Sequence, residues 1–550
     1  MNRRGRICID AAVILMMATV LFAFWRFVHI EYINYHEEYQ LFLLNTDYFA
    51  EHLRYPGGIA AWVAKFLTQF FIIASAGATV LALLLIILLL LVRHRVKITA
   101  LALIPLAVML TAMGDENLMP AYLVSIIMAM AIEAALPQTR NWGVNVALTV
   151  VASVLSYWVT GPMAWLTMLL TIFRHNSSDS ISRRITTGGI AALALVTITF
   201  VSCKTSAFPA ERIITGLYYY RNPIETIGIV ALSVPIAIFV LSVLYDWTLG
   251  KGVIEHLKNR KWLLPTASVA VVVLSIILVP KGYAPESCDH MRYDYYVRAQ
   301  LWDDIIEEAD RKKPTDPFCI CALNLALAKR GELCDRMFDY TQNYNLGLLP
   351  PLELDHSTPL ASAEVFWHMG LINSAQQYCF EAMEAIPDYQ KSGRIIKRLA
   401  QTNIVNGQYD VARKYLHILQ QTLLYRFWAN KEMARLNKDA EEREMSIISD
   451  PLYGHLRMML LDEDVFFRDA NADIMFGKLF LKNKSNSLAK QYLIAYPLVM
   501  KDLKTFYTYM GVVQTYSDYM PLAAQEALSI IMPQQVRAIR GSYFNYLNSK

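Results

Sequence analysis

The chain has 550 residues, of which 55% are hydrophobic and 18% are charged, a composition too apolar for an ordinary soluble protein, whose apolar share is roughly 45–50%. The net charge of +4 provides no basic face for a polyanion, and nucleic-acid binding is excluded. The apolar excess belongs to the N-terminal half, because residues 281–550 hold 31 of the 51 basic and 33 of the 47 acidic residues.

Apolar runs follow one another through the first 280 residues. Each approaches the roughly 20 residues that a helix needs to cross about 30 Å of hydrocarbon. The nine runs are 11–29, 66–92, 98–113, 120–136, 144–159, 163–173, 185–203, 226–247 and 263–280. The run 163–173 is short by itself. The pattern predicts a polytopic, helical membrane domain over residues 1–280 with about nine transmembrane helices.

The basic residues predict the orientation. With a cytoplasmic N-terminus, the inner segments carry 14 Lys and Arg and the outer segments carry 6, as the positive-inside rule requires. The first run ends in bulky Trp25, Arg26 and Phe27, which favours an uncleaved anchor over a signal peptide. An odd number of crossings then places residues 281–550 outside the cytoplasm.

The first outer loop, residues 30–65, shows helical amphipathicity. Glu37, Gln40, Asp47, Glu51 and Arg54 follow a three-four spacing with apolar residues on the other side. This pattern is typical of a helix that lies on the membrane and contacts lipid. The sequence Pro-Gly-Gly at 56–58 is expected to end this helix.

Two further outer loops carry candidate chemistry. Asp115 and Glu116 stand in a short second loop, so that with Glu37 and Glu38 they offer oxygen ligands for a divalent cation such as Mg²⁺ or Mn²⁺, or a general base. The fourth loop carries Lys204, Arg212, Arg221 and the tyrosines 218–220, a set suited to a lipid phosphate. For each loop alone, the alternative is solvation and interfacial anchoring.

Residues 281–550 read as amphipathic helices separated by prolines. Three segments repeat a small residue, an alanine twelve positions later and a large aliphatic residue four positions after that. They are Gly370, Ala382, Ile386; Ala400, Ala412, Leu416; and Gly477, Ala489, Leu493. The pattern resembles the tetratricopeptide repeat and predicts an α-solenoid that holds a protein or peptide partner. The alternative for its aromatic residues is that they only build the core between the helices. For the cysteines, the alternatives are buried free thiols and a Cys321–Cys334 disulfide.

The layout of the membrane half resembles the polytopic C-type glycosyltransferases and oligosaccharyltransferases, which use polyprenyl-phosphate sugars. The resemblance implies that Glu37 or Glu38 and Asp115 or Glu116 are the catalytic acids, and that Arg212 or Arg221, with Lys204 nearby, contacts the donor phosphate. No Trp-Trp-Asp signature is present, which argues against an asparagine acceptor.

The phrases EEYQLFLLNTDY (37–48) and PGGIAAWVAKFLTQFF (56–71), followed by a helical-repeat tail, are similar to a membrane family of Bacteroidota. This likeness implies a Gram-negative inner membrane with a periplasmic tail, and brings no activity with it. The sequence thus predicts an all-α protein, and the resemblance implies a C-type glycosyltransferase or oligosaccharyltransferase on the periplasmic face, with the repeat domain binding the acceptor or a partner. The alternative is a non-catalytic membrane-anchored scaffold for envelope assembly, and a transporter ranks third.

Overall fold

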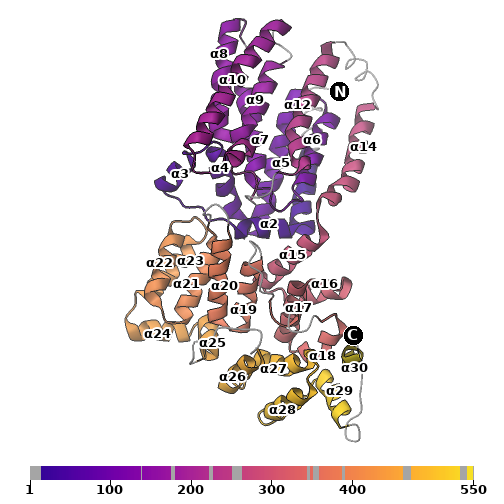
Figure 1. The fold of residues 1–550 in the computed structure, drawn as a ribbon, viewed down its shortest axis with the longest axis vertical. Helices are drawn as coiled ribbons and strands as arrows, with labels where there is room; N and C mark the ends of the chain where they lie inside the picture. Colours follow the sequence, from indigo (N-terminus) through magenta and orange to yellow (C-terminus); the bar gives the residue numbers. More distant parts are fainter. Residues whose placement is uncertain are drawn as a thin grey trace. The chain divides into compact units, whose positions relative to one another are not determined.

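The structure is a computed structural model that describes residues 14–137, 139–174, 180–221, 227–250, 263–342, 347–350, 358–386, 391–461, 472–532 and 542–548. Within these ranges all regular secondary structure is helical (Figure 1). The one extended pairing among them is an isolated antiparallel bridge between Leu118 and Tyr220. The all-α prediction is therefore confirmed. The chain folds as two compact units, Met1–Pro285 and Glu286–Lys550.

The first unit consists of helices joined by short connections. In chain order they are η1 (Phe24–Val28), α2 (Ile30–Glu38), α3 (Thr46–His52), α4 (Gly58–Thr68), η2 (Gln69–Ile72), α5 (Ala74–Val96), α6 (Thr99–Ala112), α7 (Pro120–Ala135), α8 (Trp142–Thr160), η3 (Gly161–Met163), α9 (Ala164–Ile172), α10 (Ile181–Thr205), α11 (Ala210–Thr215), α12 (Ile229–Gly250), α14 (Leu263–Leu278) and η4 (Val279–Gly282). Helix α5 lies in the core, where Leu81, Leu85 and Leu88 are fully buried. It ends at Val96, after a last turn rich in basic residues that complement the helix dipole, and its capping residue Lys97 has a φ of +52°.

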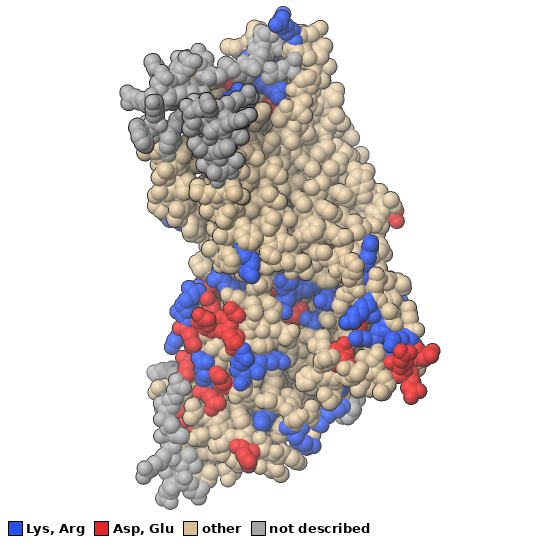
Figure 2. Space-filling view, turned by 180° about the vertical axis from the view of Figure 1, so that it is seen from behind, with Lys and Arg blue, Asp and Glu red and all other residues tan. Residues whose placement is uncertain are grey.

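Four described stretches are long and apolar enough to cross a membrane, or up to six if each of two bent helix pairs forms one span. On the face drawn in Figure 2, charged side chains are sparse over the first unit and dense over the second. Many large apolar side chains of the first unit are exposed, among them Leu193, Ile229 and Ile276. Such exposure suits contact with lipid and would be costly in water.

One of the four stretches, Trp142–Ile172, turns back on itself. The hydroxyl oxygens of Ser156 and Thr167 are 2.8 Å apart although eleven residues separate them in sequence. In one straight helix they would be about 16 Å apart. The chain reverses at Gly161, whose φ of +69° is accessible mainly to glycine. The runs 144–159 and 163–173 therefore form the two arms of a helical hairpin.

Charged side chains among the apolar helices of the first unit pair with one another. Arg95 on α5 lies 2.8 Å from Asp246 on α12, and Arg174 lies 3.0 Å from Glu133 on α7. Arg174 also donates to the carbonyls of Glu133 and Leu136, both at 2.8 Å, and so caps the C-terminal end of α7. These contacts give the charged residues of the helix ends a structural role.

The second unit consists of short helices that follow one another closely in sequence. They are α15 (Pro285–Ala299), α16 (Trp302–Arg311), α17 (Pro317–Arg330), α18 (Leu333–Arg336), η5 (Met337–Asp339), α19 (Thr358–Met369), α20 (Ile372–Ala385), α21 (Gly393–Val405), α22 (Tyr409–Gln420), α23 (Arg426–Leu436), α24 (Ala440–Ile448), α25 (Pro451–Met459), α26 (Ala472–Lys482), α27 (Ser487–Val499), α28 (Leu503–Gln514), α29 (Leu522–Ile531) and α30 (Ser542–Asn548). Consecutive helices pack together in pairs, α19 with α20, α21 with α22 and α26 with α27 (Figure 1).

The repeated small residues lie at these pairings. Ala400 and Ala412 are fully buried on the paired helices α21 and α22. A side-chain carbon built at Gly477 on α26 would touch the Leu493 methyl group on α27 at 3.7 Å. Gly370 instead has a φ of +83° and forms the turn between α19 and α20. The small residues thus allow the helices to approach closely, while the class of repeat stays a prediction.

Replacing Ala412 with leucine is expected to lower the free energy of unfolding by about 1–3 kcal/mol, because the added atoms must fit into a closed helix contact. Thermal unfolding of the full chain in detergent measures the effect. Val411→Leu, at the exposed neighbouring position, is the matched control and should change stability by no more than about 0.5 kcal/mol. Equal stabilities of the two variants would contradict this packing.

The choice between buried thiols and a disulfide is decided for the four central cysteines. Cys319, Cys321, Cys334 and Cys379 are buried and unpaired in the structure. Burial raises the pKa of the Cys379 thiol to about 12, so this group is an unreactive, space-filling side chain at neutral pH.

Candidate functional site

The second and fourth loops of the first unit are joined by backbone hydrogen bonds. The amide of Met119 donates to the carbonyl of Tyr219 at 2.9 Å, and the amide of Arg221 donates to the carbonyl of Asn117 at 2.8 Å. These bonds flank the bridge between Leu118 and Tyr220. Two segments about a hundred residues apart in sequence are thereby held in register.

Tyr219 fixes the fourth loop to the turn between α8 and α9. Its hydroxyl donates to the carbonyl of Thr160 and accepts from the amide of Met163 at 3.2 Å. The loop reaches this position through Gly216, whose φ is +111° and where a side-chain carbon would lie 2.2 Å from the Tyr219 ring. A glycine is therefore required there.

Asp115 is oriented by this arrangement. Its carboxylate accepts from the Tyr220 hydroxyl, with oxygen–oxygen distances of 3.2 and 3.0 Å, and from the amide of Asn117 at 3.0 Å. The structure thus brings an acid of the second loop directly against a tyrosine of the fourth loop. Charge-assisted bonds of this kind fix the direction of a carboxylate.

The segment 30–65, the first predicted loop, contributes through α2. The guanidinium carbon of Arg221 lies 4.4 Å from the ring centroid of Tyr35 and 4.1 Å from that of Tyr39. The Nη2 atom of Arg221 lies 3.3 Å from Nδ1 of His36. Because the two tyrosine ring centroids are only 5.1 Å apart, the rings form a corner on one side of the guanidinium instead of enclosing it. All three loops therefore meet at Arg221.

Three of the four predicted acids, Glu38, Asp115 and Glu116, lie near this centre. Glu37 and Glu38 are both buried, with 2% and 4% of their surfaces exposed, and Glu38 accepts from the Asn34 amide at 2.9 Å. Tyr35 lies within electrostatic range of Arg221, Glu116 and Glu38. The first loop is also divided into α2, α3 and α4, and α2 is buried on all sides, so the polar face predicted for it is not solvated along this helix.

The two other predicted phosphate-binding residues lie elsewhere. Arg212 is buried and donates to the carbonyl of Leu217 at 3.0 Å, so it braces the fourth loop from within. Lys204 is exposed near the end of α10, with its ammonium 5.6 Å from the Phe200 ring centroid. Of the three basic residues, Arg221 is the one that the structure places against α2.

Sequence reasoning missed the aromatic partners of the site. Tyr32, Tyr35, His36 and Tyr39 follow a three-four spacing, which marks one face of a helix. This signal was visible, but a helix face rich in tyrosine is as typical of membrane-interface anchoring as of a binding site. The arginine that this face contacts is 185 residues away from His36.

A second missed residue, His52, ends α3. Its Nδ1 lies 2.8 Å from the carbonyl of Tyr48, and its ring stacks on Tyr218 of the fourth loop, with ring centroids 6.1 Å apart. Burial, with a contribution from Lys65, lowers the pKa of His52 to about 4, despite the opposing hydrogen bond to Tyr48. His52 is therefore neutral at physiological pH.

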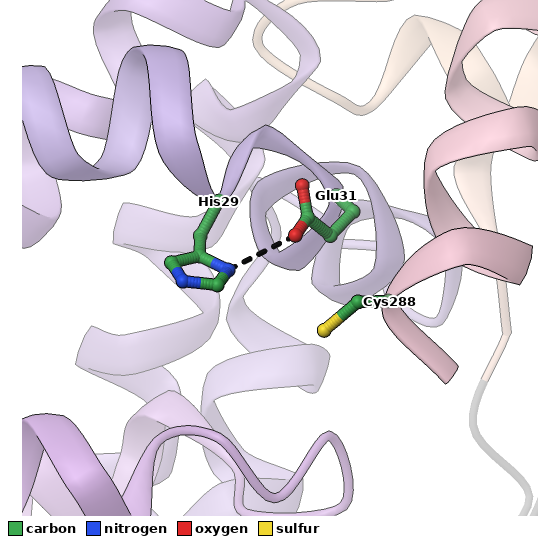
Figure 3. Close-up of side chains that lie close together, drawn as sticks. All are labelled: His29, Glu31 and Cys288. Carbon is green, nitrogen blue, oxygen red and sulfur yellow. Dashed lines mark hydrogen bonds and ion pairs between the residues drawn. The ribbon is translucent and has the colours of Figure 1, made fainter. Parts of the chain in front are cut away.

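The predicted acids do not form a closed metal cage. Among the described residues of the first unit, no three of the four acids come together as ligands of one ion. His29 and Glu31 form a separate pair, with the imidazole Nδ1 facing the carboxylate at 3.0 Å (Figure 3). The ring of His29 also stacks on Tyr283, with centroids 4.0 Å apart, which is a sufficient structural role for this pair.

Fold and site together define a protein that is all-helical over its described residues, with four candidate membrane spans, or up to six if each bent helix pair is one span, and with three loops that meet at one arginine. Residues 6–543 match the sequence model of DUF6057, a family of unknown function, and the chain belongs to this family. No curated protein and no solved structure matches it.

Proposed function

We propose that the protein is a C-type membrane glycosyltransferase or oligosaccharyltransferase, which transfers a sugar from a polyprenyl-phosphate-linked donor on the periplasmic face of the inner membrane. The proposal includes nine crossings, a cytoplasmic N-terminus, and a periplasmic TPR-like solenoid that binds the acceptor or a partner. The observation that carries it is the contact of Tyr220 with Asp115 next to Arg221, because it joins the acidic and basic loops.

Sugar transfer requires a group that accepts a proton and a group that stabilises negative charge. The acceptor must lose a proton as its oxygen or nitrogen bonds to the anomeric carbon, and the departing phosphate takes the electron pair of the broken bond. Asp115 is suited to take the proton, because Tyr220 and the Asn117 amide fix its direction. Glu37, Glu38 and Glu116 are the alternatives, and Arg221 is the cation for the phosphate.

A divalent cation fits this proposal without a cage of three acids. Mg²⁺ is commonly held by one or two carboxylates together with substrate phosphates and water. Asp115 and Glu116, adjacent in the second loop, would supply such carboxylates. A bound cation would stabilise the charge that develops on the leaving phosphate.

The test is complementation of a strain that lacks the gene, with envelope glycans and glycoproteins as the readout. Asp115→Asn is expected to slow transfer at least about 100-fold, since the base or ligand is lost while the size is kept. Tyr220→Phe should cause a smaller loss of about tenfold, because it only releases the carboxylate. Asp47→Asn, which changes an exposed acid of the first loop, is the control and should restore the glycans fully. Full restoration by Asp115→Asn at normal membrane abundance would count against the proposed role of Asp115.

The alternative function is a membrane-anchored TPR scaffold for envelope assembly. It is favoured by the bonds of Glu38 with Asn34 and of Asp115 with the Asn117 amide, which are bonds that purely structural acids make. A scaffold requires these acids only for folding. It therefore predicts that glycan defects follow protein abundance in every acid variant, whereas the transferase predicts defects at normal abundance.

A further inference from the structure

Arg221 is a buried cation with unused hydrogen-bond donors. Only 5% of its surface is exposed, and its Nε and Nη1 have no hydrogen-bond partner among the residues that the structure describes. Leaving these two buried donors without an acceptor is costly, because they lose their bonds to water.

His36 adds a third donor. The Nη2 group of Arg221 can only donate, so Nδ1 of His36, 3.3 Å away, must be the acceptor. The imidazole proton then lies on Nε2, which is buried and has no partner among the described residues. The unused groups of Arg221 and His36 are therefore all donors, and the ligand that satisfies them must be an acceptor.

The arrangement around the guanidinium favours an anion with several oxygens. Tyr35 and Tyr39 form a corner on one side and stabilise the cation through their ring faces. The N–H groups of Nε and Nη1 lie on different edges of the planar guanidinium. A phosphate can accept two N–H groups from one such edge, and arginine is the residue best suited to bind it in this way.

We infer that Arg221 and His36 form a binding site for a phosphate group. The phosphate belongs either to a lipid headgroup or to free phosphate in solution. Its assignment to a polyprenyl donor rests on the proposed function, whereas the phosphate site itself does not. Arg212 and Lys204 make the separate contacts described above.

The test is calorimetric titration of the purified full chain in detergent micelles with three probes, farnesyl phosphate, inorganic phosphate and farnesol. Binding of farnesyl phosphate alone identifies a lipid phosphate, and comparable binding of inorganic phosphate identifies free phosphate. Either result supports the site. Equal affinity for farnesol and farnesyl phosphate, or no phosphate binding at all, would overturn it.

Variants assign the site to its residues. Arg221→Gln is expected to weaken phosphate binding roughly 10- to 100-fold, since charged hydrogen bonds are lost. His36→Gln keeps a donor near the Nε2 position and should bind nearly as wild type, while His36→Asn should bind more weakly. Lys204→Gln is the control for loss of one positive charge and should bind unchanged. Circular dichroism checks the folding of each variant.

Should Arg221→Gln not fold, Arg221→Lys retains the charge but not the fork of donors, and should still lose about tenfold in affinity. Unchanged affinity in a folded Arg221 variant would refute the inference. The outcome is separable from that of the proposed function. If phosphate binds through Arg221 but the acid variants restore every glycan, the phosphate site is supported and the transferase is refuted. If the acid variants lose glycans but phosphate does not bind through Arg221, the transferase is supported and the phosphate site is refuted.

Discussion

Replacing Glu364 with glutamine is expected to lower the free energy of unfolding of the second unit by about 3 kcal/mol, because breaking a buried ion pair from one side leaves a charge uncompensated. Glu364 on α19 is 2% exposed and lies between two arginines of α21, 3.5 Å from Arg394 and 2.5 Å from Arg398. Arg394 also binds Asp294 of α15 at 2.9 Å. The network thus joins three helices.

The effect should depend on pH. Burial alone would raise the pKa of Glu364, but Arg398 and Arg394 outweigh it and lower the pKa from 4.5 to about 2. A lowered pKa contributes stability that is present above pH 4.5 and is lost as the pH falls toward 2. Wild type and Glu364→Gln should therefore differ at pH 7 and converge in acid. Glu441→Gln, at an exposed position, is the control. A pH-independent difference in thermal unfolding would contradict the ion-pair explanation.

Replacing Gly58 with alanine is expected to destabilise the first unit by about 3 kcal/mol. A side-chain carbon at Gly58 would lie 1.7 Å from the carbonyl oxygen of His52, and a backbone atom cannot move aside as a flexible side chain can. The substitution would also disturb the neighbouring bond from the Gly57 amide to the carbonyl of Trp158, which is 3.0 Å long. The turn that links α3 to α4 should then lose its position on α8.

The matched control for Gly58 is Gly189 on α10. Nothing lies within 4 Å of a side-chain carbon built at Gly189, and alanine there should stabilise the helix by roughly 0.5–1 kcal/mol. Thermal unfolding of both variants in detergent, compared with wild type, provides the measurement. A Gly58→Ala variant as stable as wild type would mean that the α3–α4 turn is not built as described.

The helical class was predictable because hydrophobic runs and three-four spacing are local properties of the sequence. The path of the chain through these helices was less predictable. The run 66–92 is divided between the end of α4, η2 and α5. The runs 144–159 and 163–173 form a hairpin, since their separation at Gly161 reflects one backbone angle that composition does not reveal.

The candidate site was predictable in its charged residues and not in their partners. Glu38, Glu116 and Arg221 were selected because their loops were assigned to one side of a membrane, and the structure brings them near Tyr35. The contact of Tyr220 with Asp115 joins residues 105 positions apart. Such a pairing depends on the packing of entire helices, which a spacing pattern does not specify. For the same reason the sequence could not distinguish Arg212 from Arg221 as a candidate phosphate ligand, although the structure shows that Arg212 hydrogen-bonds within its own loop.

The transferase proposal is tested most directly by a variant that combines Glu37→Gln, Glu38→Gln, Asp115→Asn and Glu116→Gln. It is introduced into a strain that lacks the gene, its membrane abundance is matched to wild type, and the envelope glycans are compared. The proposal predicts loss of at least one glycan or glycoprotein at normal abundance, because every candidate base and cation ligand has been removed. Restoration of all envelope glycans by this variant would contradict the transferase and leave the scaffold as the function of the protein.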